Sequence, residues 1–451
     1  MKRFKKILAL SLAATMTVAA LAGCGSKAPA GSGSNVTGGA EGKVLNIYVW
    51  NEEFKSRVTD HYPGYVKVDD TNGKIGDVDV KWHITPNENN AYQNNLDETL
   101  LKQSSAAADD KIDLFLVEAD YALKYVDTEY TMPVKDLGLT DAELANQYKY
   151  TQDIVTDSKG VLKGLSWQGC PGVLIYSRAV AKDVFGTDDP AEVQKKVSDW
   201  DTFEKSAEEV KAKGYYMVSG YDDTYRVFSN NVSSPWVVDG KVVIDDALMD
   251  WVEQTKNFTD KGYNSKSTLW EDPWKKGFYA EGKVFCYFGP AWFIDFSMAA
   301  DTAGSLANNG GWAVTEGPQG FFWGGTWICA ATGTDNPTLV ADIMRQLTTN
   351  ETIMKEIVEK DNDFVNNKPA MEAMAKTDYK SNPLGGQNPL PMFVAGADKV
   401  DLSNLSSYDQ GCNEEFQAAM KDYFNGNATL EQAIANFKKN IVVKYPNLKA
   451  E

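Results

Sequence analysis

Short apolar runs alternate with longer amphipathic stretches in the region that begins at residue 44. Residues 44–50, 78–84 and 112–117 are apolar runs of strand length. Residues 54–61 and 92–104 lie between them, and the leucines of the second stretch share one helical face. Alternation of this kind is typical of a mostly parallel sheet with helices on both faces. The sequence therefore predicts an α/β fold.

Polar and aromatic residues follow each of these apolar runs. They combine carboxylates, amides and aromatic rings: Trp50, Asn51, Glu52, Glu53, Asn87, Asp120 and Tyr121. In an open parallel sheet, ligands bind past the carboxyl ends of the strands, so we expect these residues to line one site. The alternatives are a solvated loop around Trp50, an ordinary turn at Asn87 and an N-cap role for Asp120.

A leader of a different kind precedes this region. Four basic residues come before the apolar run 7–20, which is too short for a confident membrane span, and small residues then lead to Cys24. This order is typical of a secretory signal peptide. Because the break ends in a cysteine, residues 1–23 resemble a bacterial lipoprotein signal, with Cys24 as the lipidated N-terminus. An ordinary signal with a chance cysteine is the alternative.

Residues 24–43 are rich in glycine and serine, which predicts a flexible tether between the anchor and the folded region. Two acyl chains hold a protein at a bilayer far better than one. We therefore expect the mature protein to lie at the outer face of the cytoplasmic membrane, attached through its lipid anchor.

The later part of the chain continues the alternation of strands and helices. Glycines and a proline cluster at residues 160–172 between two strands, which predicts a crossing between lobes. Ser198 is expected to cap a helix. Residues 215–220 are expected to form a strand that leads into the aromatic and acidic stretch 221–225. Two amphipathic helices are predicted at the C-terminal end.

Charge and residue usage exclude several classes of function. The net charge of −18 becomes −22 when the four basic residues of the leader are removed. Such a surface repels nucleic acid, so we expect no nucleic-acid partner. His61 and His83 are the only histidines and belong to no metal-binding or catalytic motif, so we expect neither metal nor cofactor.

The cysteines beyond the leader form no CxxC motif. Cys286 and Cys329 lie in apolar, strand-like runs and are therefore expected to be buried free thiols. A disulfide is the alternative, and the sequence leaves the pairing open for all four: Cys170, Cys286, Cys329 and Cys412.

Several short motifs occur in an order that resembles one known family. They are Ile112-Asp113, Asp120-Tyr121, residues 198–203, Gly282-Lys283-Val284-Phe285, Gly289-Pro290-Ala291-Trp292, Gly324-Gly325-Thr326 and the helix start Asn336-Pro337. Together they resemble the extracellular solute-binding proteins of family 1, the maltose-binding-protein-like sugar-binding subunits of ABC importers. The resemblance covers nearly the whole mature chain. It implies a class II periplasmic-binding-protein-like fold with two α/β lobes.

The resemblance also implies three crossings between the lobes, which we place near residues 166–172, 314–317 and 361–368. One lobe would then comprise residues 44–167 plus 316–364, and the other residues 168–315 plus 365–451. In the family the ligand lies between the lobes, and hinge closure traps it. The closed form docks on the permease subunits, whose ATPases drive import.

Further ligand contacts come from matching the family's motifs. In addition to the strand-end residues, the candidates are Trp167, Tyr221, Asp222, Asp223, Tyr225, Trp292, Trp323, Tyr408 and Asp409. Aromatic rings can stack on the apolar faces of sugars, and carboxylates can bind their hydroxyls. Core packing is the alternative for the tryptophans. Ala291 departs from the commonest family spacing before Trp292.

These observations predict a monomeric, lipid-anchored binding protein that captures an oligosaccharide and passes it unchanged to an ABC importer. The same fold could instead bind a peptide, a polyamine or another cation, which the negative charge favours. An exported glycoside hydrolase has only the paired carboxylates Glu52/Glu53 and Asp222/Asp223 in its support. A surface adhesion or sensor protein is the remaining alternative. We expect the protein not to be an enzyme.

Overall fold

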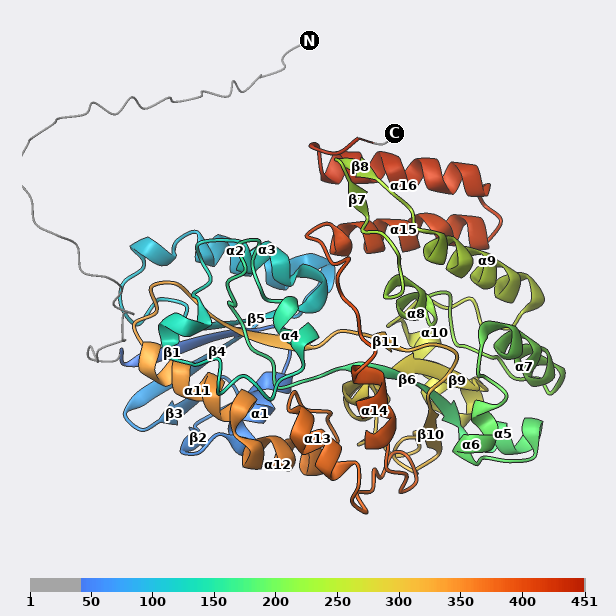
Figure 1. Cartoon of the computed structure of the whole chain (residues 1–451), viewed down its shortest axis with the longest axis horizontal. Helices are drawn as coiled ribbons and strands as arrows, with labels where there is room; N and C mark the ends of the chain where they lie inside the picture. The colour runs from blue at the N-terminus through green and yellow to red at the C-terminus, as the bar shows by residue number, and fades with distance from the viewer. Residues whose placement is uncertain (1–41, 450–451) are drawn as a thin grey trace, which may run out of the picture. The chain divides into compact units, whose positions relative to one another are not determined.

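The computed structural model describes residues 42–449. The first of its sheets has six strands (Figure 1). The strands run in the order β12-β5-β1-β4-β3-β2. Their bounds are β1 Val44–Val49, β2 Tyr65–Lys67, β3 Asn72–Ile75, β4 Val78–Ile84, β5 Leu114–Glu118 and β12 Thr326–Ala330. Strand β1 is parallel to both β4 and β5, with Ile47 opposite Trp82 and Leu114.

The other pairings of this sheet are antiparallel, so the expectation of a mostly parallel sheet is wrong. Strands β2, β3 and β4 follow one another through short turns, which forces them to alternate in direction. Strand β12 comes from a distant part of the chain and runs against β5, with Ile328 opposite Leu116.

A second sheet is built around β6 (Pro171–Ser177). Its partners are β9 Cys286–Gly289, β10 Trp312–Thr315 and β11 Phe321–Phe322, each antiparallel to β6. The hairpin of β7 (Val237–Val238) and β8 (Lys241–Val242) stands apart from it. Residues 215–220 make only isolated bridges, such as Tyr216 with Val284, so the strand expected there is wrong.

Helices occur both before and after β6 along the chain. Those associated in sequence with the first sheet are α1 Glu53–His61, α2 Ala91–Leu100, α3 Ala122–Val126, α4 Lys149–Asp153, α11 Pro337–Thr349 and α12 Glu351–Asp361. The others are α5 Arg178–Phe185, α6 Pro190–Gln194, α7 Trp200–Ala212, α8 Tyr225–Ser229, α9 Asp246–Lys261, α10 Asp272–Lys275, α13 Lys368–Met374, α14 Leu390–Ala397, α15 Asp409–Phe424 and α16 Leu430–Lys444.

Side-chain caps explain where several helices begin. Asp199, and not the expected Ser198, caps α7 by accepting a hydrogen bond of 2.8 Å from the amide of Thr202. The extended backbone of Asp199 directs its carboxylate at this amide. Thr429 and Gln432 form a capping box at the start of α16.

The hydrophobic core has a large and a small cluster. The large one runs through both sheets and includes the fully buried Trp167, Trp312 and Trp327. The small one joins α8 and α9 to the predicted C-terminal helices α15 and α16, which pack side by side in Figure 1. Most tryptophans of the described region are therefore part of the hydrophobic core.

The four cysteines of the described region are buried and free, which for Cys286 and Cys329 is the expected state. His61 hydrogen-bonds Asp361 at 2.7 Å, and His83 hydrogen-bonds Asn46 at 3.0 Å. Within residues 42–449, no helix combines the length and the hydropathy that a bilayer span needs. The signal peptide, Cys24 and nearly all of the tether lie outside the described residues. The assignment of residues to two lobes stays a prediction.

Candidate functional site

The site lies at one edge of the first sheet. Strands β1, β4 and β5 are parallel, so their carboxyl ends reach the same edge. Strand β12 is antiparallel to β5, with Thr326 opposite Glu118, so the turn that precedes β12 arrives at this edge as well. That turn contains Gly324 and Gly325, whose φ angles of 69° and 101° suit glycine.

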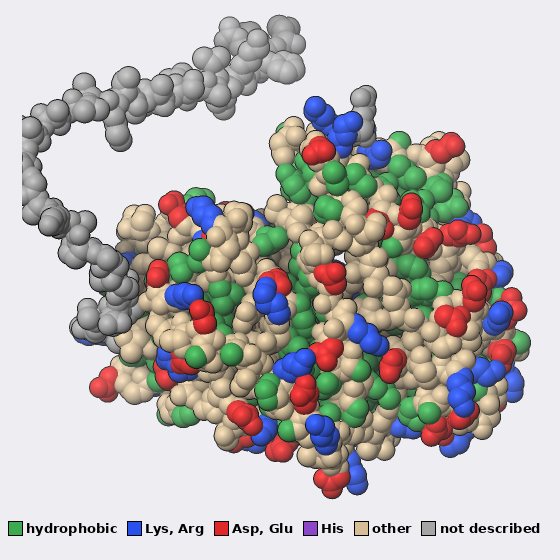
Figure 2. Space-filling model, viewed as in Figure 1, with side chains coloured by type: hydrophobic (Ala, Val, Ile, Leu, Met, Phe, Trp, Pro, Cys, Tyr) green, Lys and Arg blue, Asp and Glu red, His purple; other side chains and the backbone are tan. Residues whose placement is uncertain are grey.

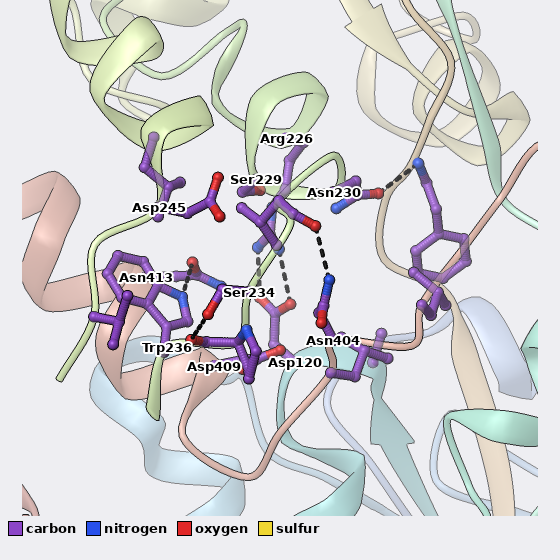
Figure 3. A pocket seen from close by; sticks show the side chains of 18 of the residues that line it. Asp120, Arg226, Ser229, Asn230, Ser234, Trp236, Asp245, Asn404, Asp409 and Asn413 are labelled. Atoms are coloured by element: carbon purple, nitrogen blue, oxygen red, sulfur yellow. Dashed lines mark hydrogen bonds and ion pairs between the residues drawn. The ribbon is translucent and has the colours of Figure 1, made fainter. Parts of the chain in front are cut away.

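An ion pair connects this edge to α8. Asp120 follows β5 in a short 3₁₀ turn, and its amide donates to Glu118 Oε2 at 2.8 Å. Arg226 of α8 donates two parallel hydrogen bonds to the Asp120 carboxylate, one of them from Nη1 to Oδ1 at 2.8 Å. Figure 3 shows the Arg226 side chain extending to Asp120. A bidentate pair of this geometry is a strong, directional contact.

Burial shapes the charges around this ion pair. It raises the pKa of Glu118 to about 8, and the neighbouring Asp120 adds to the rise. Burial also raises the pKa of Asp409 to about 7. It would by itself lower the pKa of Arg226, but Asp120 keeps that pKa above its ordinary value. One cation thus stands among three acidic groups, two of which carry a proton readily.

A first recess, which we call the Asp120 recess, opens beside the ion pair. Hydroxyl, amide and indole groups surround it: Ser229, Asn230, Ser234, Trp236, Asn404 and Asn413. Several of these are held in place, since Asn413 Oδ1 accepts from Tyr225 at 2.5 Å and from Trp236 at 3.1 Å. Asp409 at the start of α15 also lines it and accepts from Ser406 at 2.6 Å. Polar groups oriented in this way suit a ligand rich in hydroxyls.

A second recess, the Asp222 recess, adjoins the first because Arg226 lines both. Asp222, Asp223, Tyr225 and Trp323 contribute to it. Asp223 accepts from the Gly220 amide at 2.5 Å and from Trp274 Nε1 at 2.8 Å, and burial raises its pKa to about 7. An aromatic ring and two acidic groups thus adjoin the ion pair.

Some predicted site residues are brought together here. Six of them line one recess or the other: Asp120, Asp222, Asp223, Tyr225, Trp323 and Asp409. Trp292 lines neither recess but contacts Trp323, with ring centroids 5.3 Å apart and its Nε1 donating to the Trp323 carbonyl at 3.3 Å.

Other predicted residues lie outside both recesses, and their contact with ligand stays a prediction: Trp50, Asn51, Glu52, Glu53, Asn87, Tyr121, Trp167, Tyr221 and Tyr408. Trp167 is wholly buried and stacks on Phe54 at 5.5 Å. Gln168 donates to Glu53 at 2.7 Å. The Tyr221 hydroxyl donates to Asn425 at 2.8 Å. Trp167, Glu53 and Tyr221 thus have partners within the protein and do not line either recess.

Sequence reasoning did not place Trp236, Asn404 and Asn413 in the site, and it considered Arg226 only as a possible donor to a ligand hydroxyl. Arg226 directly follows Tyr225 in the predicted acidic and aromatic stretch, so its charge was a usable signal. Asn404 and Asn413 carried none, because isolated amides are common in loops and helices. Throughout residues 42–449, no group of His, Cys, Asp or Glu is arranged to hold a metal ion.

Three comparisons relate the chain to known proteins. A family model described as bacterial extracellular solute-binding protein matches residues 66–384. No curated protein matches the chain. Among solved structures, an extracellular solute-binding protein of family 1 is similar with a TM-score of 0.70 and 20% identity, over 88% of this chain and 99% of that one.

Two further structures are similar over comparable lengths. The ABC transporter associated binding protein from B. animalis subsp. lactis Bl-04, in complex with β-1,6-galactobiose, has a TM-score of 0.67 and 17% identity, covering 91% of this chain and 99% of its own. The sugar-binding protein MalE from Xanthomonas citri has a TM-score of 0.64 and 13% identity, covering 89% and 98%. At these identities the likeness concerns the fold, and it confirms the expected α/β binding-protein-like fold. The number of crossings stays a prediction.

Proposed function

The chain belongs to the bacterial extracellular solute-binding proteins, and on that premise we propose that it captures an oligosaccharide and delivers it to an ABC importer. The family consists of extracytoplasmic binding proteins, so the expectation that the chain is not an enzyme is confirmed. What we propose beyond family membership is that the ligand is a sugar and that the partner is an ABC importer.

One observation carries the choice of a sugar. The Asp120–Arg226 pair lies among side-chain hydroxyls and amides, the indole of Trp236 and two further carboxylates, Asp245 and Asp409. Paired donors and acceptors of this kind match the hydroxyls on a sugar's edge. Trp323 supplies an aromatic ring beside them, as the apolar face of a sugar requires.

The structural neighbours support the same choice. One was solved with β-1,6-galactobiose, another with acarbose, and a third is described as a sugar-binding protein. Their low identity leaves the particular sugar open to experiment. On the face of residues 42–449 that Figure 2 shows, Lys and Arg are interspersed with Asp and Glu, which does not suit a nucleic-acid partner.

The proposal includes attachment to the membrane. Cys24 would carry the lipid, and residues 24–43 would separate the folded region from the bilayer. The protein would act as a monomer at the outer face of the cytoplasmic membrane. It would present its ligand-bound form to permease subunits, which their ATPases power.

Calorimetry with the mature protein tests the sugar. Titration with β-1,6-galactobiose, maltose and maltotriose should give saturable binding with at least one of them. Asp120→Ala should weaken that binding, because it removes a charged acceptor worth about 1.5–3 kcal/mol. Asp141→Ala is the matched control, since Asp141 is largely exposed at 80% and lies outside both recesses.

The same titrations test the alternative ligands. Binding of spermidine or of a peptide by the wild-type protein, without binding of any sugar, would contradict the proposal. Arg226 lines the Asp120 recess together with Asp120, Asp245 and Asp409, so the titrations decide between a sugar and a cation.

A further inference from the structure

Carboxylates outnumber cations among the side chains that line the Asp120 recess. Three of the lining side chains are acidic and one is basic (Figure 3): Asp120, Asp245, Asp409 and Arg226. Arg226 directs two parallel hydrogen bonds to Asp120, so that carboxylate has its counter-charge within the protein. Within residues 42–449, no basic side chain forms an ion pair with Asp245 or Asp409. The recess therefore carries more negative than positive charge.

Both of these carboxylates are almost completely buried, with 8% exposure each. Asp245 is the N-cap of α9 and accepts from Ser233 Oγ at 2.7 Å and from the Ala247 amide at 3.0 Å. Asp409 accepts from Ser406 Oγ at 2.6 Å, and this donor is neutral. Buried charges are normally paired with an opposite charge. Asp409 is thus a buried acid whose charge no described residue compensates by a direct ion pair.

The electrostatic environment of Asp409 favours an incoming cation. Burial raises the pKa of Asp409 to about 7, and Asp120 raises it by more than Arg226 lowers it. The Asp120–Arg226 pair therefore does not present net positive charge to Asp409. The other titratable groups that face Asp409 are uncharged up to about pH 8, because burial raises their pKa values: Tyr225, Cys412 and Tyr445.

The adjoining Asp222 recess contains an independent feature that points the same way. Asp222 is 6% exposed, and its Oδ1 has no hydrogen-bond partner among the described residues. Lys421 Nζ lies 3.9 Å from the other oxygen. A buried carboxylate oxygen without a partner carries a desolvation cost that a donor of the ligand would relieve. An ammonium group offers three such donors and brings no acceptor to be satisfied.

We propose that the cleft is specific for amino sugars, whose rings carry an ammonium group, and that Asp409 is the residue that selects them. The ammonium group donates to Asp409, while hydroxyls of the same ring meet the side-chain amides of Asn404 and Asn413. The inference rests on the proposed function and narrows its ligand class. A neutral sugar would satisfy the amides but not the charge of Asp409. A polyamine would satisfy the charge but not the amides.

Matched ligands separate the charge from the rest of the sugar. One set is galactose, galactosamine and N-acetylgalactosamine, and the other is cellobiose with the matching dimers of glucosamine and N-acetylglucosamine. Within a set, the same carbon carries a hydroxyl, an ammonium or an amide. In calorimetry with the mature protein, an ammonium form should have a Kd at least about tenfold lower than its two neutral counterparts, because it alone pairs with Asp409.

Asp409→Asn tests the selecting residue. The asparagine keeps the shape of the side chain and removes its charge, so the preference for the ammonium form should disappear while the Kd for the neutral form changes little. Stability should not fall, because a buried carboxyl is replaced by a neutral amide. Asp141→Asn is the matched control at a position that is 80% exposed, and it should keep the preference. Should Asp409→Asn not fold, the ligand sets still decide with the wild type alone.

The pH dependence gives a second readout. An ammonium group pairs with the ionised form of Asp409, so its Kd should fall about tenfold from about pH 5.5 to about pH 7, where that form becomes common. The Kd of a neutral sugar should change little. Glu118, whose pKa is about 8, adds negative charge in the same direction. Calorimetry in two buffers of different ionisation enthalpy should register the release of about one proton at about pH 6.

The outcomes distinguish this inference from the proposed function. Ammonium forms that bind no better than neutral sugars, or not at all while another sugar such as maltotriose binds, would overturn the specificity for amino sugars and leave the proposed function standing. A preference that persists in Asp409→Asn would overturn the role of Asp409. If the wild type binds no sugar of any kind, both proposals fall.

Discussion

Asp120 and Arg226 form a bidentate ion pair in the candidate site. Their side chains are 21% and 22% exposed, so this pair is intermediate between a surface and a buried ion pair. Arg226 has further acidic neighbours in Glu118 and Asp409, but its two hydrogen bonds to a carboxylate go to Asp120. Removal of either partner should leave a partly buried charge without its match.

We therefore expect a measurable coupling between the two residues. Asp120→Asn and Arg226→Gln should each lower the free energy of unfolding by about 1–3 kcal/mol, between the effects typical of exposed and buried pairs. The double variant should lose less than the sum of the two single losses. Urea denaturation measures all four proteins. Additive losses would show that the pair contributes no interaction of its own.

At the scale of elements, the turn between β11 and β12 positions Trp323. Gly325 has a φ angle of 101°, and a Cβ there would lie 2.9 Å from Cys170 Sγ. Gly324 is equally close to Trp292, where a Cβ would lie 3.0 Å from the ring. The turn therefore depends on glycine for both its conformation and its close packing.

Gly325→Ala should destabilise the protein by about 1–3 kcal/mol through backbone strain, with the close contact adding to this. Gly333→Ala is the matched control, because Gly333 also has a positive φ angle, of 83°, but has open space around it. The difference between the two variants in urea denaturation isolates the packing contribution. Equal losses would mean that the contact with Cys170 has no energetic effect.

At the scale of the whole molecule, buried carboxyl groups give stability a distinct pH dependence. Burial raises the pKa of six of them to values between about 6 and about 8: Glu53, Asp113, Glu118, Asp223, Asp295 and Asp409. Their pKa values in the unfolded chain are near 4. Between these limits the folded protein binds more protons than the unfolded chain, so stability falls as pH rises.

Thermal denaturation at constant ionic strength should therefore show a falling Tm from about pH 5 to about pH 8. Exposed carboxyls do not oppose this trend, because they are ionised in both states over this range. Burial lowers the pKa of His83, so this residue makes stability rise with pH, but it is one group against six carboxyls. A Tm that rises steadily across the range would contradict the raised pKa values.

Glu53→Gln tests one contributor directly. Glu53 lies among Arg57, Asp363 and Gln168, and its pKa is raised to about 7, chiefly by burial. The glutamine has no proton to lose, so the variant should show a shallower fall of Tm with pH. Glu88→Gln, at an exposed position, should keep the slope of the wild type.

Several features of the fold were predictable because they depend on neighbours in the sequence. The strands β1, β4 and β5, the α/β alternation and the last two helices follow from local periodicity of apolar residues. The mostly parallel sheet was wrong, because β2, β3 and β4 pair in antiparallel fashion through short turns and β12 joins β5 from a distant part of the chain. The strand at 215–220 was wrong, because these residues make only isolated bridges. The choice of Asp199 over Ser198 as a cap rested on backbone geometry that either residue could have satisfied.

By itself, the sequence determined where β1, β4 and β5 lie and that polar and aromatic residues follow them, since both are properties of short segments. Only the tertiary structure decided which of those residues share a recess. Asp120 pairs with Arg226 across 106 positions of chain, and Trp167 enters the core while Trp270 does not. Burial and ion pairing depend on what packs from elsewhere in the molecule, and no local pattern carries that information.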